Sequence, residues 1–246
     1  MMISEQNYYF HSKIRKMKIE ILEFVEGASN ARGVAVIIDV FRAFSVACYA
    51  SDAGASRLIA TGSIDDALFL KSQYRNSVLA GERDEKRIEG FDLGNSPTEI
   101  IKCDLTGKTF IHTTTAGTQG LVSAVNADLV LAGSIVNAGA IVNYIKRLNP
   151  EHVSLVAMGY RAVISAEEDL ICAAIIRDGL MGIDKKYDSE ISKLRDSAGK
   201  RFFEASNIDF SPPTDFFLCT MPDRFDFVLK GEKRFDGNVD LQRVDI

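Results

Sequence analysis

Short, almost wholly apolar runs recur along this chain of 246 residues. The clearest covers residues 34–39, where Val-Ala-Val-Ile-Ile ends on an aspartate. A run of this length without alternating polar residues is typical of a strand that is buried on both faces of a sheet. Further runs of this kind cover residues 57–60, 77–80, 109–113, 129–132, 153–158 and 225–229. This repetition predicts a sheet with many parallel strands, because such strands are usually covered on both faces.

Segments with the apolar spacing of helices separate these runs. The clearest cover residues 64–74, 138–148 and 166–180. Strands that alternate with helices predict an α/β fold, with a largely parallel or mixed sheet and helices on both faces in three layers. Right-handed crossovers would place the loops that follow the strands at one edge of the sheet.

The two ends of the chain differ from its middle. Residues 1–16 are polar, aromatic and basic, and we expect them to be an extension that precedes a domain over residues 17–246. Residues 184–205 are charged and predict a helical, solvated or lid-like element. A Ser-Pro-Pro sequence then interrupts the chain at 211–213. These features are compatible with a small C-terminal subdomain that is divided from the rest of the chain near residues 181–214.

Charge and hydropathy exclude several classes of protein. The formal net charge of −5 argues against a nonspecific nucleic-acid binder, because such proteins usually carry a basic face. An anionic substrate must therefore be held by local cations. No apolar run approaches the ~20 residues of a membrane span, so no membrane contact is expected.

The cysteines and the first residues favour a cytoplasmic location. Cys48, Cys103, Cys172 and Cys219 are scattered, without the spacing of a metal site, and indicate reduced thiols. Residues 1–16 contain no apolar signal core. A homo-oligomer is expected only because such assemblies are common.

Polar residues follow four of the predicted strands. Asp39, Glu82, Thr113 and Gly159 lie at or just beyond the ends of these runs. Ligands of open α/β sheets bind outside the carboxyl ends of the strands. We therefore expect these four positions to converge on one site.

Asp39 offers two interpretations. A carboxylate at the end of a buried strand is costly unless it is paired or bound to a metal. It could pair with Arg42, or cap a helix that begins near Ser45. Alternatively, Asp39 and Glu82 could bind Mg²⁺, which prefers oxygen ligands and usually takes one or two carboxylates.

Other carboxylates are weaker candidates for the metal. Asp169 is the third predicted metal ligand, beside Asp39 and Glu82. Asp169 and its neighbour Glu168 open a predicted helix, where the helix dipole also stabilises acidic residues. Asp92 is a further candidate in the loop after residues 77–80.

Three arginines follow predicted strand ends and are candidates for binding an anion. Guanidinium groups of Arg42, Arg83 and Arg161 could bind phosphate, sulfonate or carboxylate oxygens in a bidentate manner. A surface salt bridge is the alternative for each of them. Arg42 is preferred, because it lies between an apolar strand and an apolar helix.

A run of small polar residues follows the strand predicted at 109–113. It reads Thr113-Thr114-Thr115-Ala116-Gly117-Thr118. Hydroxyls, backbone amides and a helix N-terminus at this place favour an anion-binding loop over an ordinary helix cap, which needs only one hydroxyl. Thr114, Thr115, Gly117 and Thr118 are the predicted contacts, and Ser45, Asn95 and Ser96 could add donors.

The loop at residues 81–97 combines charged residues, glycines and a turn at Gly94-Asn95-Ser96-Pro97. Together with Asp39-Val40-Phe41-Arg42-Ala43 and the threonine run, it resembles the 2-phosphosulfolactate phosphatase family. The three motifs occur in the family's order, and the similarity extends from about residue 17 to at least residue 180.

The resemblance implies a Mg²⁺-dependent phosphatase associated with coenzyme M biosynthesis. Its substrate would be (2R)-2-phospho-3-sulfolactate, with Asp39, Arg42 and Glu82 as catalytic residues. Two positions depart from the family's pattern, since Phe44 replaces an expected small hydroxyl residue and Ala116 an expected asparagine. A phosphatase of another phospho-hydroxy acid and a non-catalytic anion-binding protein therefore remain alternatives.

Overall fold

The computed structural model describes residues 17–246, so the predicted extension at 1–16 lies outside the described residues. The strands are β1 (Lys18–Glu23), β2 (Val34–Ile38), β3 (Arg57–Thr61), β4 (Ser77–Arg83), β5 (Lys86–Arg87), β6 (Thr109–Thr113), β7 (Leu129–Gly133), β8 (His152–Ala157), β9 (Phe227–Lys233) and β10 (Val239–Asp245). The α-helices are α1 (Phe24–Asn30), α2 (Ala43–Asp52), α3 (Ile64–Gln73), α4 (Pro97–Ile100), α5 (Gly117–Ser123), α6 (Ala138–Leu148), α7 (Glu167–Met181), α8 (Asp188–Lys193) and α9 (Pro213–Cys219).

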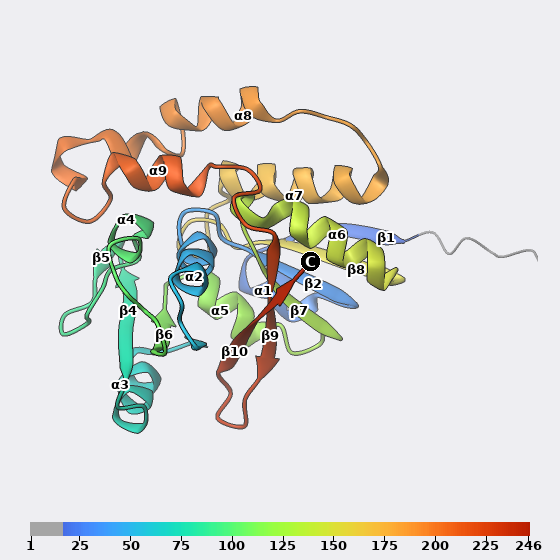
Figure 1. Ribbon diagram of the computed structural model, residues 1–246. Coiled ribbons are helices and arrows are strands. Elements are labelled where there is room, and N and C mark those ends of the chain that lie inside the picture. The colour runs from blue at the N-terminus through green and yellow to red at the C-terminus, as the bar shows by residue number, and fades with distance from the viewer. Residues whose placement is uncertain (1–16) are drawn as a thin grey trace, which may run out of the picture.

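The strands form one mixed sheet in the order β1-β8-β2-β7-β9-β10-β3-β6-β4-β5 (Figure 1). Strands β1, β8, β2 and β7 form one parallel group, and β3, β6 and β4 form another. The hairpin of β9 and β10 lies between the groups and pairs antiparallel with both. Three antiparallel junctions in succession mean that the two groups run in opposite directions. The predicted α/β fold with a mixed sheet is confirmed.

A central core lies on one face of the whole sheet, around α2 and α5. It contains Ile37 from β2, Phe110 from β6 and Leu229 from the joining hairpin, together with Val46 from α2 and Leu121 from α5. Figure 1 shows α2 and α5 between β4 and β6 on one side and β2 and β7 on the other. The sheet therefore surrounds these two helices, and the carboxyl ends of both groups can approach each other despite their opposite directions.

The opposite face of the sheet is covered in two places. Over the first group, Ile38 and Leu155 pack with Ile141 of α6 and Ile176 of α7. Over the second group, side chains of β3, β4 and β6 pack with Leu70 of α3. Successive residues of each strand thus enter different cores, because side chains alternate between the two faces of a strand. Helices cover both faces, as predicted.

The C-terminal residues contribute both a helical segment and two central strands. Only residues 188–193 of the helix expected at 184–205 are α-helical, and short 3₁₀ turns follow at Leu194–Asp196, Lys200–Phe203 and Ala205–Asn207. The chain leaves the helix because Leu194 and Phe202 pack with Phe216 of α9 in a separate apolar cluster. The last predicted strand is β9, whereas β10 was not predicted. Within residues 17–246, no helix is long and apolar enough to cross a membrane.

Candidate active site

A narrow cleft lies where the carboxyl ends of β2, β4, β6 and β8 meet. Its lining includes Asp39 after β2, Glu82 in β4, Thr115 after β6 and Gly159 after β8. The structure therefore brings three of the four predicted strand-end positions into one cleft, with Thr115 in place of the nearby Thr113. Water can enter a volume of only about 40 Å³, which holds a few water molecules.

Asp39 occupies the floor of this cleft. Its Oδ1 accepts a hydrogen bond of 3.0 Å from the backbone N of Ala43, at the start of α2. Helix α5 also approaches closely, since a Cβ at Gly117 would lie 2.7 Å from Asp39 Oδ2. Burial, and then the negative charge of Glu82, raise the pKa of Asp39 to about 6. The carboxylate form is therefore energetically costly here, although it predominates at pH 7.

Glu82 is held by the threonine loop. Its Oε1 accepts a hydrogen bond of 2.7 Å from the N of Thr115, and its Oε2 accepts one of 2.9 Å from the N of Glu85. The hydroxyl of Thr115 also donates to Oε2 at 3.2 Å. The amide and hydroxyl donors of Thr115, predicted to bind an anion, thus position this carboxylate.

Charge in the cleft is only partly compensated. Three ion pairs join Arg42 to Asp215 at 2.7 Å, Arg161 to Asp84 at 2.7 Å, and Arg201 to Glu85 at 3.3 Å. Neither Asp39 nor Glu82 forms an ion pair with any residue in the described part of the chain. Two buried carboxylates therefore face one cleft without an ion pair, an arrangement that a bound cation would stabilise.

Arg42 anchors the C-terminal segment to the start of α2. Its Nη1 donates to Asp215 Oδ2 at 2.7 Å and to the backbone O of Phe210 at 2.6 Å. The side chains of Arg42 and Asp215 are only 3% and 0% exposed. Arg42 lines the cleft, but these contacts already occupy much of its guanidinium group. Its assignment as a catalytic, anion-binding residue stays a prediction.

Two predicted serine donors form internal hydrogen bonds. Ser45 donates to the backbone O of Val40 at 2.9 Å and contacts the hydroxyl of Ser134 at 2.7 Å. Ser96 donates to Asp215 Oδ1 at 2.8 Å. Both serines are fully or almost fully buried. Their hydroxyls therefore stabilise the walls behind the cleft.

Thr114, Thr118 and Arg83 likewise have partners within the protein. The N of Thr114 donates to Thr118 Oγ1 at 2.9 Å, and the N of Thr118 donates to Thr114 Oγ1 at 3.2 Å. This reciprocal pattern caps the start of α5. Arg83 donates to Thr113 Oγ1 at 3.0 Å, and burial lowers the pKa of Arg83.

Asn95 lines the cleft, and its Oδ1 lies 3.1 Å from Nε2 of His112. Burial, and then the charge of Arg83, lower the pKa of His112 to about 3. His112 is therefore neutral near pH 7, and its ring fixes the amide of Asn95. Arg161 lies at the mouth of the cleft, where its side chain is about half exposed.

Asp169 fastens the ends of β2 and β8 to each other. Its Oδ1 accepts from the N of Val40 at 2.8 Å, and its Oδ2 accepts from the N of Gly159 at 2.9 Å. Burial, and then the charges of Glu168 and Asp39, raise its pKa well above the usual range. Burial also raises the pKa of Glu168 to about 7, partly offset by Arg201.

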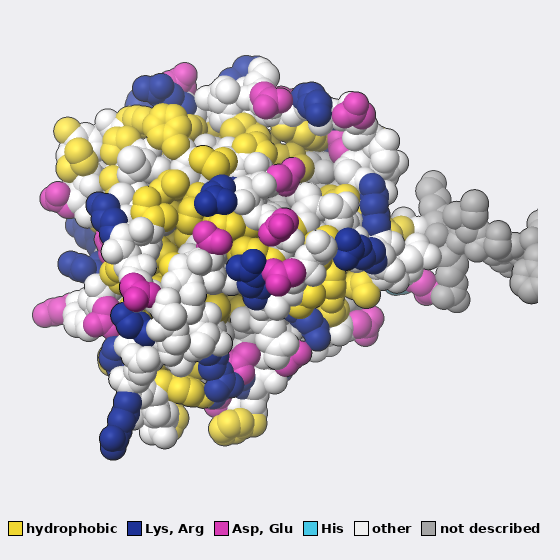
Figure 2. Space-filling model, viewed as in Figure 1, with side chains coloured by type: hydrophobic (Ala, Val, Ile, Leu, Met, Phe, Trp, Pro, Cys, Tyr) yellow, Lys and Arg dark blue, Asp and Glu magenta, His cyan; other side chains and the backbone are white. Residues whose placement is uncertain are grey.

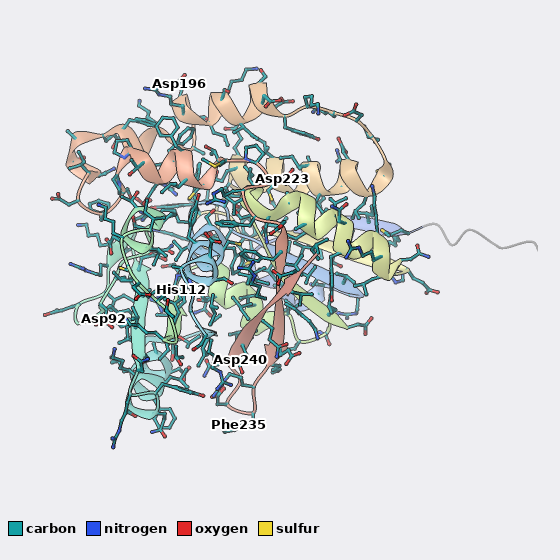
Figure 3. All side chains as sticks on the ribbon, viewed as in Figure 1. Asp92, His112, Asp196, Asp223, Phe235 and Asp240 are labelled. Atoms are coloured by element: carbon teal, nitrogen blue, oxygen red, sulfur yellow. The ribbon has the colours of Figure 1, made fainter. Side chains whose placement is uncertain are left out.

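Asp92 lies away from the cleft, on the side of α3 (Figure 3). Its Oδ2 accepts from the N of Leu79 at 2.8 Å and from Lys71 at 3.0 Å. These contacts join the loop after β4 to the outer face of the sheet. The structure thus gives Asp92 a purely structural setting.

Sequence reasoning missed Arg201 and Asp215. Arg201 lies in the 3₁₀ turn Lys200–Phe203, and Asp215 lies in the first turn of α9. No predicted strand precedes either residue, so the strand-end argument could not identify them. A buried arginine such as Arg42 does require an anionic partner, but the sequence offers many acidic residues for that role.

The residues of the cleft fit Mg²⁺ only as an ion shared with a ligand. Within residues 17–246, no group of three or more histidine, cysteine or acidic side chains could hold a metal alone. Asp39 and Glu82 are nevertheless two oxygen donors without ion pairs, and Mg²⁺ often binds one or two carboxylates together with substrate phosphate oxygens and water. Asp169 already accepts two backbone hydrogen bonds.

A mixed sheet with a polar cleft at its strand ends defines an α/β enzyme that acts on a small polar molecule. Comparison with known proteins specifies the class. The family model described as 2-phosphosulpholactate phosphatase matches residues 20–207. The chain therefore belongs to the 2-phosphosulfolactate phosphatase family, a family of phosphoric monoester hydrolases.

Individual relatives agree with this assignment. The chain is 33% identical to a protein of Thermotoga petrophila over 78% of this chain and 86% of the relative. It is 32% identical to a protein of Bacillus subtilis over 85% of this chain and 91% of the relative. A protein of Carboxydothermus hydrogenoformans is 41% identical over 62% of this chain and 63% of the relative. All three are named "Probable 2-phosphosulfolactate phosphatase".

Proposed function

We propose that this protein hydrolyses (2R)-2-phospho-3-sulfolactate to 3-sulfolactate and phosphate in a Mg²⁺-dependent reaction. The names of its relatives support this substrate. The observation that supports the metal is the pair of buried carboxylates, Asp39 and Glu82, that line one cleft without ion pairs. A multiply anionic substrate would add further negative charge. A divalent cation would offset the charge of the two carboxylates and that of the substrate.

Hydrolysis breaks the bond between phosphorus and the ester oxygen, and water supplies the atoms that complete both products. Bound Mg²⁺ would polarise the phosphoryl group and neutralise charge that develops on it. Asp39 and Glu82 would hold this ion. Ala43 and Thr115 orient these two carboxylates through their backbone amides, so the donors are arranged before the substrate binds.

The attacking group could be water or Asp39 itself. Asp39 is buried, lines the cleft and is ionised above a pKa of about 6. A positioned carboxylate near a metal can form an acyl phosphate, whereas the same carboxylate could instead orient water. Borohydride reduction of enzyme quenched during turnover separates these routes, because it converts an aspartyl phosphate at Asp39 to homoserine, whereas direct attack by water leaves Asp39 unchanged.

The reaction is tested by measuring phosphate release from 2-phosphosulfolactate with Mg²⁺ and with EDTA. We expect rapid release that EDTA abolishes and excess Mg²⁺ restores. Equal release in EDTA would refute the metal. Faster release from another phospho-hydroxy acid would favour the alternative substrate, and tight binding of 3-sulfolactate without release would favour a non-catalytic binding protein.

We also propose a role in coenzyme M biosynthesis and a cytoplasmic location. The role in coenzyme M biosynthesis follows from the proposed substrate and from the resemblance to the 2-phosphosulfolactate phosphatase family. The second is supported by free thiols at Cys48, Cys103, Cys172 and Cys219, the state that cysteines keep in a reducing compartment. A host deletion that leaves coenzyme M synthesis unchanged would contradict the first proposal.

A homo-oligomer is the remaining part of this proposal. Hydrophobic side chains gather on the surface over α9 and the residues around it (Figure 2). Ile208, Phe217 and Met221 are 56%, 52% and 42% exposed. Apolar surface of this kind often marks an interface. Sedimentation of the wild-type protein and of Phe217→Ser tests this, and a monomeric wild type would contradict it.

A further inference from the structure

Arg201 enters the cleft from a part of the chain remote from the strand ends. It lies in the 3₁₀ turn Lys200–Phe203 and lines the cleft together with Asp39. Its guanidinium donates to the backbone O of Phe41 at 3.2 Å and lies 3.3 Å from Glu85 Oε1. Arg201 is also close enough to Asp39 to lower the pKa of that carboxyl. A cation from the C-terminal segment therefore faces the proposed reaction centre.

The three arginines of the cleft differ in how firmly they are held. Arg42 and its partner Asp215 are almost fully buried, so this pair cannot exchange partners without opening the structure. Arg201 and Glu85 are each 21% exposed and lie 3.3 Å apart. Such a pair is easily separated, because water and ions compensate partly exposed charges.

The partner of Arg201 lies on a tight turn that closes the mouth of the cleft. Glu85 and its neighbour Asp84 connect β4 to β5, and both have left-handed backbone angles. Asp84 pairs with Arg161 as Glu85 pairs with Arg201. Both pairs line the cleft, so an anionic ester that enters it competes with Asp84 and Glu85 for the two arginines. The arginines are then free to bind the anionic groups of that ester.

The structure favours the sulfonate as the group that Arg201 binds. In the proposed substrate the phosphate is attached to C2, and the sulfonate oxygens on C3 are one bond farther from phosphorus than the carboxylate oxygens on C1. Placing phosphorus at Asp39 and Glu82 directs the sulfonate toward the mouth. There the rings of Phe41, Tyr160 and Phe202 lie 5.9, 5.6 and 5.2 Å from the guanidinium carbon of Arg201. A weakly hydrated guanidinium among rings suits a weakly hydrated anion.

We infer that Arg201 determines specificity by binding the sulfonate of the substrate in place of Glu85. This inference rests on the proposed function. It adds to that function a recognition residue from the C-terminal segment, outside the strand-end motifs. Arg201 is not assigned a part in breaking the phosphate ester.

The test compares two substrates that differ only in the sulfonate. kcat and KM are measured for 2-phosphosulfolactate and for 2-phospholactate with wild type, Arg201→Lys and Arg201→Met. We expect Arg201→Met to lower kcat/KM for the sulfonated ester about 100-fold, mainly through KM, and Arg201→Lys to recover part of this loss. The same variants should change kcat/KM for 2-phospholactate less than about 3-fold.

Arg195→Ala is the matched control, because Arg195 lies in the same segment and stacks on Phe203 without lining the cleft. It should affect both substrates equally and only slightly. An equal loss on both substrates in Arg201→Met would overturn the inference, since Arg201 would then support the fold or bind a shared group. Unchanged kinetics on the sulfonated ester would overturn it as well.

A binding measurement separates this inference from the proposed function. 3-Sulfolactate should raise the melting temperature of the wild type more than lactate does, and Arg201→Met should abolish that difference. If the wild type released no phosphate but showed this difference, the proposed function would fail and the inference would stand. If the wild type released phosphate but Arg201→Met kept this difference in melting temperature, the proposed function would stand and the inference would fail.

Discussion

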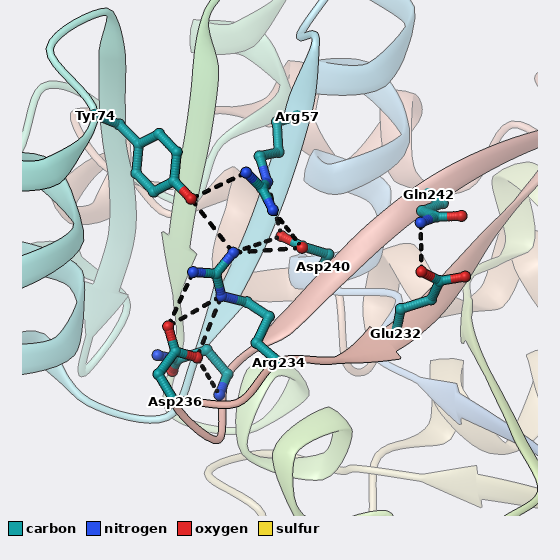
Figure 4. Close-up of polar contacts among 8 residues, drawn as sticks. Arg57, Tyr74, Glu232, Arg234, Asp236, Asp240 and Gln242 are labelled. Atoms are coloured by element: carbon teal, nitrogen blue, oxygen red, sulfur yellow. Dashed lines mark hydrogen bonds and ion pairs between the residues drawn. The ribbon is translucent and has the colours of Figure 1, made fainter.

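Two clusters of charged side chains in this protein are built in opposite ways. One joins β3 to the C-terminal hairpin and consists of Arg57, Tyr74, Arg234, Asp236 and Asp240 (Figure 4). Its two arginines balance its two aspartates. The other lies at the strand ends and includes Asp39, Glu82, Glu168 and Asp169, none of which forms an ion pair with a described residue.

The pKa shifts reflect this difference. Burial would raise the pKa of Asp236, but hydrogen bonds from Arg234 and from the N of Asn238 outweigh it and hold the pKa below the usual range. Burial raises the pKa of Asp39 to about 6, and the backbone hydrogen bond from Ala43 and the charge of Arg201 offset only part of this rise. The balanced cluster stabilises the fold. The unbalanced cluster costs stability, and such perturbed groups in a cleft are typical of active sites.

The largest expected effect comes from neutralising the unbalanced cluster. Asp39→Asn should lower kcat by at least about 10³-fold, because it removes a proposed metal ligand and the nucleophile or its orienting group. Phosphate release from 2-phosphosulfolactate measures this. Asp92→Asn is the control, since Asp92 lies on the outer face of the sheet, and its activity should stay within about twofold. Full activity of Asp39→Asn would remove Asp39 from the mechanism.

A smaller effect should follow from breaking the balanced cluster. Arg234, which is only 10% exposed, bonds both aspartates, so Arg234→Ala would leave Asp236 without its arginine and Asp240 with Arg57 alone. We expect a loss of about 2 kcal/mol in the free energy of unfolding, a fall of roughly 4–8 °C in melting temperature for a chain of this size. kcat/KM should be unchanged.

Lys230→Ala provides the contrast for this prediction. Lys230 forms a more exposed pair with Glu232 at 3.1 Å, and its removal should cost less than about 0.5 kcal/mol. If both variants unfold at the same temperature, the cluster around Arg234 adds nothing to stability.

The smallest expected effect is a change with pH in how much Asp39 destabilises the folded protein. Its folded-state pKa is raised from 3.8 to about 6, so its contribution to stability is fully present below 3.8 and is lost as the pH rises through 6. In EDTA, Asp39→Asn should therefore stabilise the protein more at pH 8 than at pH 5, by about 1.4 kcal/mol. The titration of His112 is common to both proteins, whereas Glu168, whose pKa is raised to about 7 by burial and partly by the charge of Asp39, changes the difference in the same direction.

Thermal unfolding of wild type and Asp39→Asn at both pH values measures this difference. We expect the gap between their melting temperatures to widen by roughly 3–6 °C from pH 5 to pH 8. A gap that narrows with rising pH would mean that a cation of the protein already compensates Asp39.

The parallel groups of the sheet were predictable because their strands are buried on both faces. The uninterrupted apolar sequence of β2 is an example, since all five of its residues are buried. Strand β10 was missed because it carries few apolar residues after an exposed turn at Phe235. Only Val239 and Leu241 of this strand are buried, and Val244 packs partly buried against the core over the first parallel group. The reversal between the two groups depends on this strand, so the sequence patterns gave no sign of it.

The candidate site was predictable to the extent that it lies at strand ends. Asp39, Glu82 and Gly159 follow directly from that rule and meet in the cleft. The rule cannot distinguish a side chain that faces the cleft from one that caps a helix behind it, as Thr114 does by accepting from the N of Thr118. Nor can it find Arg201, which reaches the cleft through the packing of Phe202 on Phe216.

The central claim is that Asp39 and Glu82 form an uncompensated pair that binds a divalent cation. Calorimetric titration of Mg²⁺ into the protein at pH 8, with inorganic phosphate present, tests it most directly. The account predicts saturable binding of Mg²⁺ by the wild type, at least tenfold weaker in Asp39→Asn and in Glu82→Gln. Binding of equal strength in all three proteins would contradict it.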